Sequence, residues 1–194
     1  MNTRSTKSDL TCVNQRPPNG GYKGWSAATI VVMHFILIFQ FLVLLAVANG
    51  MPVIVKKLLG DFLNYPLDAE IALSDKQPLF GSSKTIRGVI LSVIATTMVA
   101  PAIGFQFRVA LVVGSFAMLG DLASSFVKRR LKLPVSSRAT GLDQIPECLL
   151  PTLACSAMLD LSILDFCLIV SIFFVSEIAL SRLLFKWHVR DRPF

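Results

Sequence analysis

The chain has 194 residues, of which 54% are hydrophobic and only 16% are charged, and its formal net charge is +7. Soluble domains are usually about 45–50% apolar and about 25% charged, so this composition, with a mean hydropathy of +0.65, argues against a soluble domain and for an integral membrane protein. In such a chain, excess Lys and Arg mark cytoplasmic loops and anionic partners rather than nucleic acid. The length suits one unit of several membrane spans.

The N-terminal residues 1–24 are polar and rich in Pro and Gly, which predicts a mostly disordered tail. Residues 25–194 are expected to form one membrane-embedded domain. Ala46-Val47-Ala48 resembles a signal-peptidase site. The apolar stretch before it is longer than the usual 7–15 residues or so, so we expect this segment to be retained as a membrane span.

The hydropathy pattern predicts an all-α integral membrane protein with about five transmembrane helices and cytoplasmic catalytic loops. Each span needs about 20 mostly apolar residues. The first is predicted at 27–48 and the second from about Val89 to Ile103, beginning within the preceding Thr-Ile-Arg-Gly. The third starts at about Val109, a weak fourth interrupted by Pro covers about Ile145–Leu159, and the fifth covers 164–185.

The distribution of cations predicts the orientation. Five spans put the termini on opposite sides, with 5 of the 19 Lys and Arg on the side of the N-terminal tail and 14 on the other. The positive-inside rule then places the N-terminus outside and the C-terminus in the cytoplasm, in the plasma or inner membrane. Every strong polar motif falls on the cytoplasmic face. A transporter would more often place polar groups at the midplane, so this pattern favours an enzyme that uses a cytosolic nucleotide.

The loop predicted at 49–88 ends in Gly81-Ser82-Ser83-Lys84-Thr85-Ile86-Arg87-Gly88. Hydroxyl groups, backbone N–H groups and two cations just before a helix start are typical of a phosphate site. The stretch is not a Walker A motif, because that motif has a glycine where Ser83 stands. A solvated loop that caps the following helix is an equally good interpretation at this point.

The stretch 118–130, MLGDLASSFVKRR, combines a carboxylate with a basic cluster. At about 100° per residue, Asp121, Ser125 and Lys128 form one polar stripe of a helix. This stripe suits Mg²⁺ and phosphate, and the alternative is an ion pair between Asp121 and a nearby Lys or Arg at the helix end. Carboxylates within membranes are costly and are functional by default, which favours the first interpretation.

The next loop supplies a second carboxylate, Asp143, with Glu147 one turn further on. Hard oxygen ligands and cations on one face are what a Mg²⁺–triphosphate needs. Asp143 is equally well interpreted as a helix N-cap.

The remaining polar residues are expected to be structural. His34 is interpreted as a packed or hydrogen-bonded residue, Glu177 as an ion-pair partner of Arg182 or a snorkelling side chain, and Asp160 and Asp165 as solvated turn residues. No C-x-x-C pair occurs, so the cysteines are predicted to be structural free thiols: Cys12, Cys148, Cys155 and Cys167.

Four motifs, in order, give the chain a resemblance to the CDP-archaeol synthase family, membrane relatives of the phosphatidate cytidylyltransferases. The resemblance covers about residues 49–194. Its motifs are Asn49-Gly50-Met51-Pro52, then Pro66-Leu67-Asp68 with the Gly81–Gly88 stretch, then Gly120-Asp121-Leu122 with Ser125-Phe126-Val127-Lys128-Arg129, and finally Leu142-Asp143-Gln144.

The resemblance implies an enzyme that transfers CMP from CTP to a membrane lipid phosphate, either an archaeal-type ether lipid phosphate or a phosphatidate-like lipid, and releases pyrophosphate. Asp121 and Asp143 would then hold Mg²⁺, with Lys128 as a third catalytic group. Phosphate-binding candidates are Ser82, Ser83, Lys84, Thr85, Arg87, Ser125 and Arg129. Weaker site candidates are Asp68, Asn49 and Glu147.

Two positions depart from the family's pattern. Ile86 stands in place of an aromatic residue, and Pro146 in place of an aspartate, with Glu147 as the nearest acidic group. The array of aspartates and glycines that CDP-alcohol phosphotransferases carry on one helix is missing. A small non-enzymatic membrane protein, such as a transporter or a structural subunit, or a degenerate relative of the family, is the other alternative. The oligomeric state stays open, with a homodimer as one option.

Overall fold

The computed structural model describes residues 27–60, 62–69, 71, 75, 77–134, 139 and 141–186. The predicted N-terminal tail lies outside the described residues. These residues form five α-helices and a short 3₁₀ helix: α1 (Ala27–Leu59), α2 (Ile86–Val99), η1 (Ala100–Ile103), α3 (Phe107–Arg130), α4 (Gln144–Leu159) and α5 (Ile163–Lys186). The predicted all-α class is therefore confirmed.

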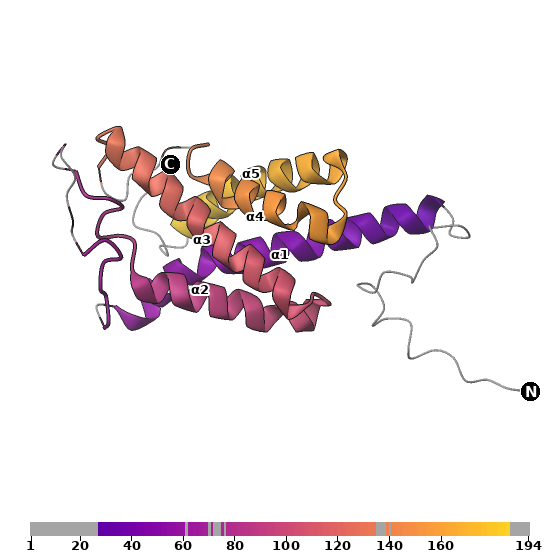
Figure 1. Cartoon of the computed structure of the whole chain (residues 1–194), viewed down its shortest axis with the longest axis horizontal. Coiled ribbons are helices and arrows are strands. Elements are labelled where there is room, and N and C mark those ends of the chain that lie inside the picture. The colour runs from indigo at the N-terminus through magenta and orange to yellow at the C-terminus, as the bar shows by residue number, and fades with distance from the viewer. Residues whose placement is uncertain are drawn as a thin grey trace, which may run out of the picture.

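The helices form one bundle in which each packs against the next along the chain. In addition, α5 contacts α1 and α1 contacts α3. Figure 1 shows α1 running the length of the bundle, with α2 on one side of it and α4 and α5 on the other. The centre is apolar and includes Phe41, Leu44 and Val113, all fully buried. Many large apolar side chains also point outward, such as Phe39 at 68% exposed, as expected where the surrounding solvent is lipid.

Four of the described helical segments are long and apolar enough to cross a membrane: Ala28–Leu59, Ile86–Ile103, Phe107–Arg130 and Ile163–Leu180. The second of these combines α2 with η1, as the sequence predicted. The helix at the predicted weak fourth span, α4, has 16 residues and is shorter than the about 20 residues that a full crossing needs.

The first helix is longer than predicted, because residues 49–59 continue α1 instead of starting the loop. Pro52 lies inside the helix and has no N–H, so it leaves the carbonyl of Ala48 without its helical partner. The hydroxyl of Ser92 on α2 donates a hydrogen bond to that carbonyl. A neighbouring helix thus satisfies the backbone group that the proline frees, which is how membrane helices tolerate proline.

Small residues set the distance between helices. A Cβ added to Gly114 of α3 would lie 3.2 Å from the Cα of Val93 on α2. A Cβ added to Gly120 would lie only 2.2 Å from the carbonyl oxygen of Pro146 on α4. Close approach at small residues is typical of helix packing in membranes, and at Gly120 it brings α4 directly against the predicted site.

At the other end of the bundle, His34 of α1 and Asp165 of α5 interact, with 2.9 Å between Nδ1 and Oδ2. The prediction that His34 is hydrogen-bonded is confirmed. The prediction that Asp165 is a solvated turn residue is wrong. Asp165 is buried at 5% exposed, because its carboxylate also accepts hydrogen bonds from the backbone N–H and the hydroxyl of Ser162. Asp160, in contrast, is exposed in the turn after α4.

The cysteines in the described part of the chain, Cys148, Cys155 and Cys167, are free thiols, as predicted.

Candidate active site

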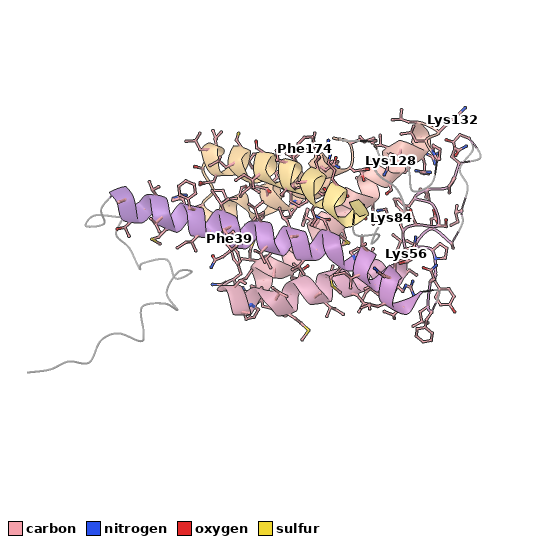
Figure 2. The ribbon with its side chains drawn as sticks, turned by 180° about the vertical axis from the view of Figure 1, so that it is seen from behind. Phe39, Lys56, Lys84, Lys128, Lys132 and Phe174 are labelled. Carbon is pink, nitrogen blue, oxygen red and sulfur yellow. The ribbon has the colours of Figure 1, made fainter. Side chains whose placement is uncertain are left out.

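The polar motifs gather at one end of the bundle. Lys84 precedes α2, Lys128 lies in the last turn of α3 and Lys56 in the last turn of α1. Figure 2 shows these three lysines and Lys132 at the same end, away from the mid-bundle residues Phe39 and Phe174. The loops before α2 and α4 and the C-terminal turns of α3 therefore build the site.

Two ion pairs join these elements. Lys84 donates a hydrogen bond to the carboxylate of Asp121. Lys128 lies 2.7 Å from Oδ1 of Asp143, measured from Nζ. Each predicted metal ligand therefore lies beside a lysine that the sequence also predicted for the site. Asp121 does form an ion pair, as the alternative predicted, but its partner is Lys84 of the loop before α2 rather than a cation at the end of α3.

Glu147 completes an acidic group around Asp121. It lies on α4 and is 7% exposed, and its carboxyl group interacts with Asp121, Glu177 and Lys84. Gly120 explains this proximity, because the absence of a side chain lets the backbone of α4 at Pro146 and Glu147 reach α3. Pro146, which departs from the family's pattern, contributes its carbonyl to this contact, while the acidic group at the site comes from the next residue.

The carboxylates fit a magnesium ion by their chemistry. The carboxyl groups of Asp121 and Glu147 interact with each other, and two such groups repel unless a proton or a cation separates them. Lys84 is a cation that interacts with both. The described residues contain no group of three His, Cys, Asp or Glu side chains placed to hold a metal. Mg²⁺ commonly binds through one or two carboxylates plus substrate phosphates and water, so the pattern of Asp121 and Asp143 suits an ion that arrives with its nucleotide.

The stretch before α2 combines both roles that the sequence left open. The hydroxyl of Thr85 accepts a hydrogen bond from the backbone N–H of Gly88 and caps α2. Ser82 and Ser83 are exposed. The capping interpretation therefore applies to Thr85, while the two serines remain accessible beside Lys84.

Asp68 holds this stretch in place. Its buried carboxylate accepts hydrogen bonds from the backbone N–H groups of Phe80, at 2.9 Å, and Gly81, at 2.8 Å. The backbone N–H of Leu67 donates to the carbonyl of Lys84 at 2.8 Å. The observed contacts make Asp68 a positioning residue for the loop that carries Lys84.

Asp143 is the N-cap residue of α4, as the second interpretation predicted, but its side chain does not cap the helix. The residue has helical φ and ψ angles and makes no capping hydrogen bond. Its carboxylate instead accepts a hydrogen bond from the N–H of Ala139 and pairs with Lys128. Asp143 thus joins the loop before α4 to the end of α3.

Three further candidates have distinct surroundings. Ser125 is buried on α3 at 2% exposed. Arg129 is buried and donates to the carbonyl of Pro134 at 2.8 Å. The side-chain amide of Asn49, on α1, has both its nitrogen and its oxygen buried without a hydrogen-bond partner among the described residues. A buried amide without partners requires an explanation, and a bound ligand is one.

Arg87 contacts the loop after α1 rather than the acidic pairs. Its guanidinium donates to the carbonyls of Phe62 and Gly60 and to Oδ1 of Asn64. The sequence analysis made Arg87 a phosphate-binding candidate, whereas in the structure both terminal nitrogens of its guanidinium donate to this loop.

Arg130 fastens the long loop between α1 and α2 to α3, a role that the sequence did not suggest. Its guanidinium donates to the carboxylate of Asp75 at 2.7 Å and to the carbonyl of Pro78, and it lies over the ring of Phe126. The sequence does show three adjacent cations at the end of α3, Lys128, Arg129 and Arg130. Which of them faces the loop depends on the rotation of α3 about its axis, which the sequence does not give.

Comparisons with known proteins find similar sequences and one similar fold. Residues 30–194 match the sequence model of the family described as CarS-like CDP-archaeol synthase. The chain is 33% identical over 154 residues to a CDP-archaeol synthase of Sulfurisphaera tokodaii, covering 76% of this chain and 89% of that protein. It is 35% identical over 123 residues to one of Pyrococcus furiosus, covering 58% and 70%.

Among solved structures, the fold is similar to that of an intramembrane enzyme for archaeal membrane lipid biosynthesis, with a TM-score of 0.59 and 21% identity. The similarity covers 71% of this chain and 90% of that one. At this identity the match shows similarity of the fold alone.

Proposed function

Because the chain belongs to the CDP-archaeol synthase family, a family of membrane cytidylyltransferases, we propose that it transfers CMP from CTP to an archaeal-type ether lipid phosphate. The products would be a CDP-activated lipid and pyrophosphate. The observation that carries the proposal is the pairing of Lys84 with Asp121 and of Lys128 with Asp143. A metal–triphosphate offers a partner of opposite charge to every member of these two pairs.

In this mechanism the lipid phosphate oxygen attacks the α-phosphorus of CTP, and the bond to the departing pyrophosphate breaks. The attacking phosphate is already anionic, so positioning and charge neutralisation are the main demands. Mg²⁺, held by Asp121 and Asp143, would neutralise the triphosphate. Lys84 and Lys128 would bind its phosphate oxygens, with the exposed hydroxyls of Ser82 and Ser83 beside them.

The other residues of the site support these groups. Asp68 fixes the loop of Lys84 through the N–H groups of Phe80 and Gly81. Burial and the neighbouring carboxylate of Asp121 raise the pKa of Glu147 well above its usual value, so the Glu147 carboxyl group favours its protonated form and lies beside Asp121 without strong charge repulsion. The buried amide of Asn49 offers its NH₂ group as a donor and its carbonyl oxygen as an acceptor to a bound substrate.

We further propose that the site faces the cytoplasm, with the chain spanning the cell membrane. The charge asymmetry of the loops supports this orientation, and CTP is available on that side.

The test uses purified protein with labelled CTP, Mg²⁺ and a panel of lipid phosphates with ether-linked, ester-linked and isoprenoid chains. We expect label to enter the ether lipid, with one pyrophosphate released per lipid, and both signals to disappear on chelation. Equal turnover of the ester lipid would refute the substrate preference. The absence of turnover with every lipid would favour a non-enzymatic role.

A further inference from the structure

The end of α1 and the loop after it carry large apolar side chains that contact little of the protein. Leu58 is 77% exposed, Phe62 68%, Leu63 53% and Tyr65 66%. They belong to the last turn of α1 and to the loop that follows it, and Figure 2 shows Lys56 of this last turn at the polar end of the bundle. Apolar side chains in this position need another partner, because contiguous exposed apolar surface marks an interaction site.

The length of α1 places this group beyond the hydrocarbon core. The 33 residues of α1 measure about 50 Å at 1.5 Å per residue, whereas the core is about 30 Å thick and takes about 20 residues. If the core begins anywhere between Ala28 and His34, it ends between about Ala48 and Ile54. The last turn of α1 and the loop therefore lie at the level of the lipid headgroups.

The charges of this region fit a lipid surface. Lys56 and Lys57 are both exposed in the last turn of α1. Basic side chains beside Phe, Leu and Tyr are the pattern of segments that lie in the plane of the interface, with lysines against anionic headgroups.

Hydrogen bonds fix the conformation of the loop after α1. The buried guanidinium of Arg87 binds the carbonyls of Gly60 and Phe62 and the side chain of Asn64. Leu63 has a φ of +53°, which is unfavourable for a leucine. Such a conformation persists only where the surroundings enforce it, and here it presents the Leu63 side chain outward.

We propose that this interfacial segment, formed by Lys56–Leu59 and Phe62–Tyr65, inserts into the leaflet that borders the active site. Its apolar side chains lie below the headgroups, and Lys56 and Lys57 bind anionic lipid phosphates. Arg87 is the residue that positions the segment. The occupant is the membrane lipid itself.

The test measures the depth of residue 62 in the bilayer. Tryptophan replaces Phe62 in a background in which Trp25 and Trp187 are phenylalanine, and the protein is placed singly in nanodiscs. The lipids carry bromine either near the headgroup or deep in the acyl chain. We expect bromine near the headgroup to quench the Phe62→Trp fluorescence more strongly, since such segments lie about 5–10 Å into the boundary.

Phe39→Trp in the same background is the matched control, because Phe39 is equally exposed at 68% but lies in the middle of α1; deep bromine should quench it more strongly. Unquenched fluorescence of Phe62→Trp with both lipids would overturn the proposal.

The role of the lysines has its own readout. Replacing phosphatidylcholine by an equal mixture with phosphatidylglycerol should strengthen the quenching at position 62. Lys56→Gln with Lys57→Gln should remove that increase, and an increase that survives would contradict the assignment of these lysines to anionic lipid.

Discussion

Gly120 is the residue on which the geometry of the site depends most. Its missing side chain lets Pro146 and Glu147 of α4 touch the backbone of α3, one residue before Asp121. The sequence motif Gly-Asp therefore has a physical reason. The glycine lets α4 approach α3 closely, and this approach brings Glu147 beside the aspartate.

Gly120→Ala should lower stability by about 1–3 kcal/mol, the usual cost of inserting a methyl group into a packed contact. It should also lower cytidylyl transfer, because α4 must move away from Asp121. Thermal unfolding of the purified protein measures the first effect. Gly50→Ala is the control: a Cβ there meets no atom within 4 Å, and in a helix the change should be neutral or stabilise by up to about 1 kcal/mol. Equal melting temperatures for both variants would contradict the account.

At this scale, the sequence indicated which polar residues lie at the same end of the bundle better than it indicated which residues they contact. Asp121, Asp143, Lys84 and Lys128 do meet at one end of the bundle, because each lies at a predicted helix end. Their pairing across elements was not predictable, since it depends on how α3 packs against the loops. The contacts of Arg87 with the loop after α1, in place of the predicted phosphate contact, were not predictable for a similar reason, since they too depend on how the elements pack. The same holds for the choice of Thr85 as the cap of α2.

Among the elements, α1 shows how a helix passes through a proline. The Ala48 carbonyl that Pro52 leaves free accepts its hydrogen bond from Ser92 of α2. The sequence suggested a loop at Asn49-Gly50-Met51-Pro52, because Gly and Pro are strong local signals for helix ends. The helix continues because a distant hydroxyl replaces the missing bond, and a single sequence cannot reveal that partner.

Ser92→Ala should destabilise the protein by about 0.6 kcal/mol, and by no more than about 1.7, the range for side-chain hydrogen bonds in membrane proteins. A double-mutant cycle with Pro52→Ala separates this bond from other effects. In Pro52→Ala the new N–H of residue 52 can bond to the Ala48 carbonyl, so removing the Ser92 hydroxyl should then cost less. Equal costs in both backgrounds would show that the two residues are not coupled.

For the whole molecule, composition alone predicted the class, because helices in lipid must be apolar on the outside as well as in the core. Hydropathy predicted about five transmembrane helices, and four of the described helical segments are long and apolar enough to cross, the second of them by combining α2 with η1, while α4 is too short. Orientation is a separate prediction, which depends on the excess of cations at the end that carries the site.

A cysteine at Leu131, which is 61% exposed at the end of α3, tests this orientation. In a background with Cys12 and Cys167 replaced by serine, it should react with an impermeant maleimide only after the cells are permeabilised. A cysteine at Ile163, 83% exposed at the opposite end, should react in intact cells. The reverse pattern would place the site outside.

The central claim is that Asp121 belongs to a CTP-dependent lipid cytidylyltransferase site, and its most direct test is the transfer of labelled CMP to ether lipid phosphate by Asp121→Asn. We predict a loss of about 100-fold or more, the usual effect of removing one electrostatic group from such a site. Asp75→Asn, which changes an acid whose ion pair with Arg130 lies outside the site, should keep turnover close to that of the unmodified protein. Turnover by Asp121→Asn that equals that of Asp75→Asn would contradict the account.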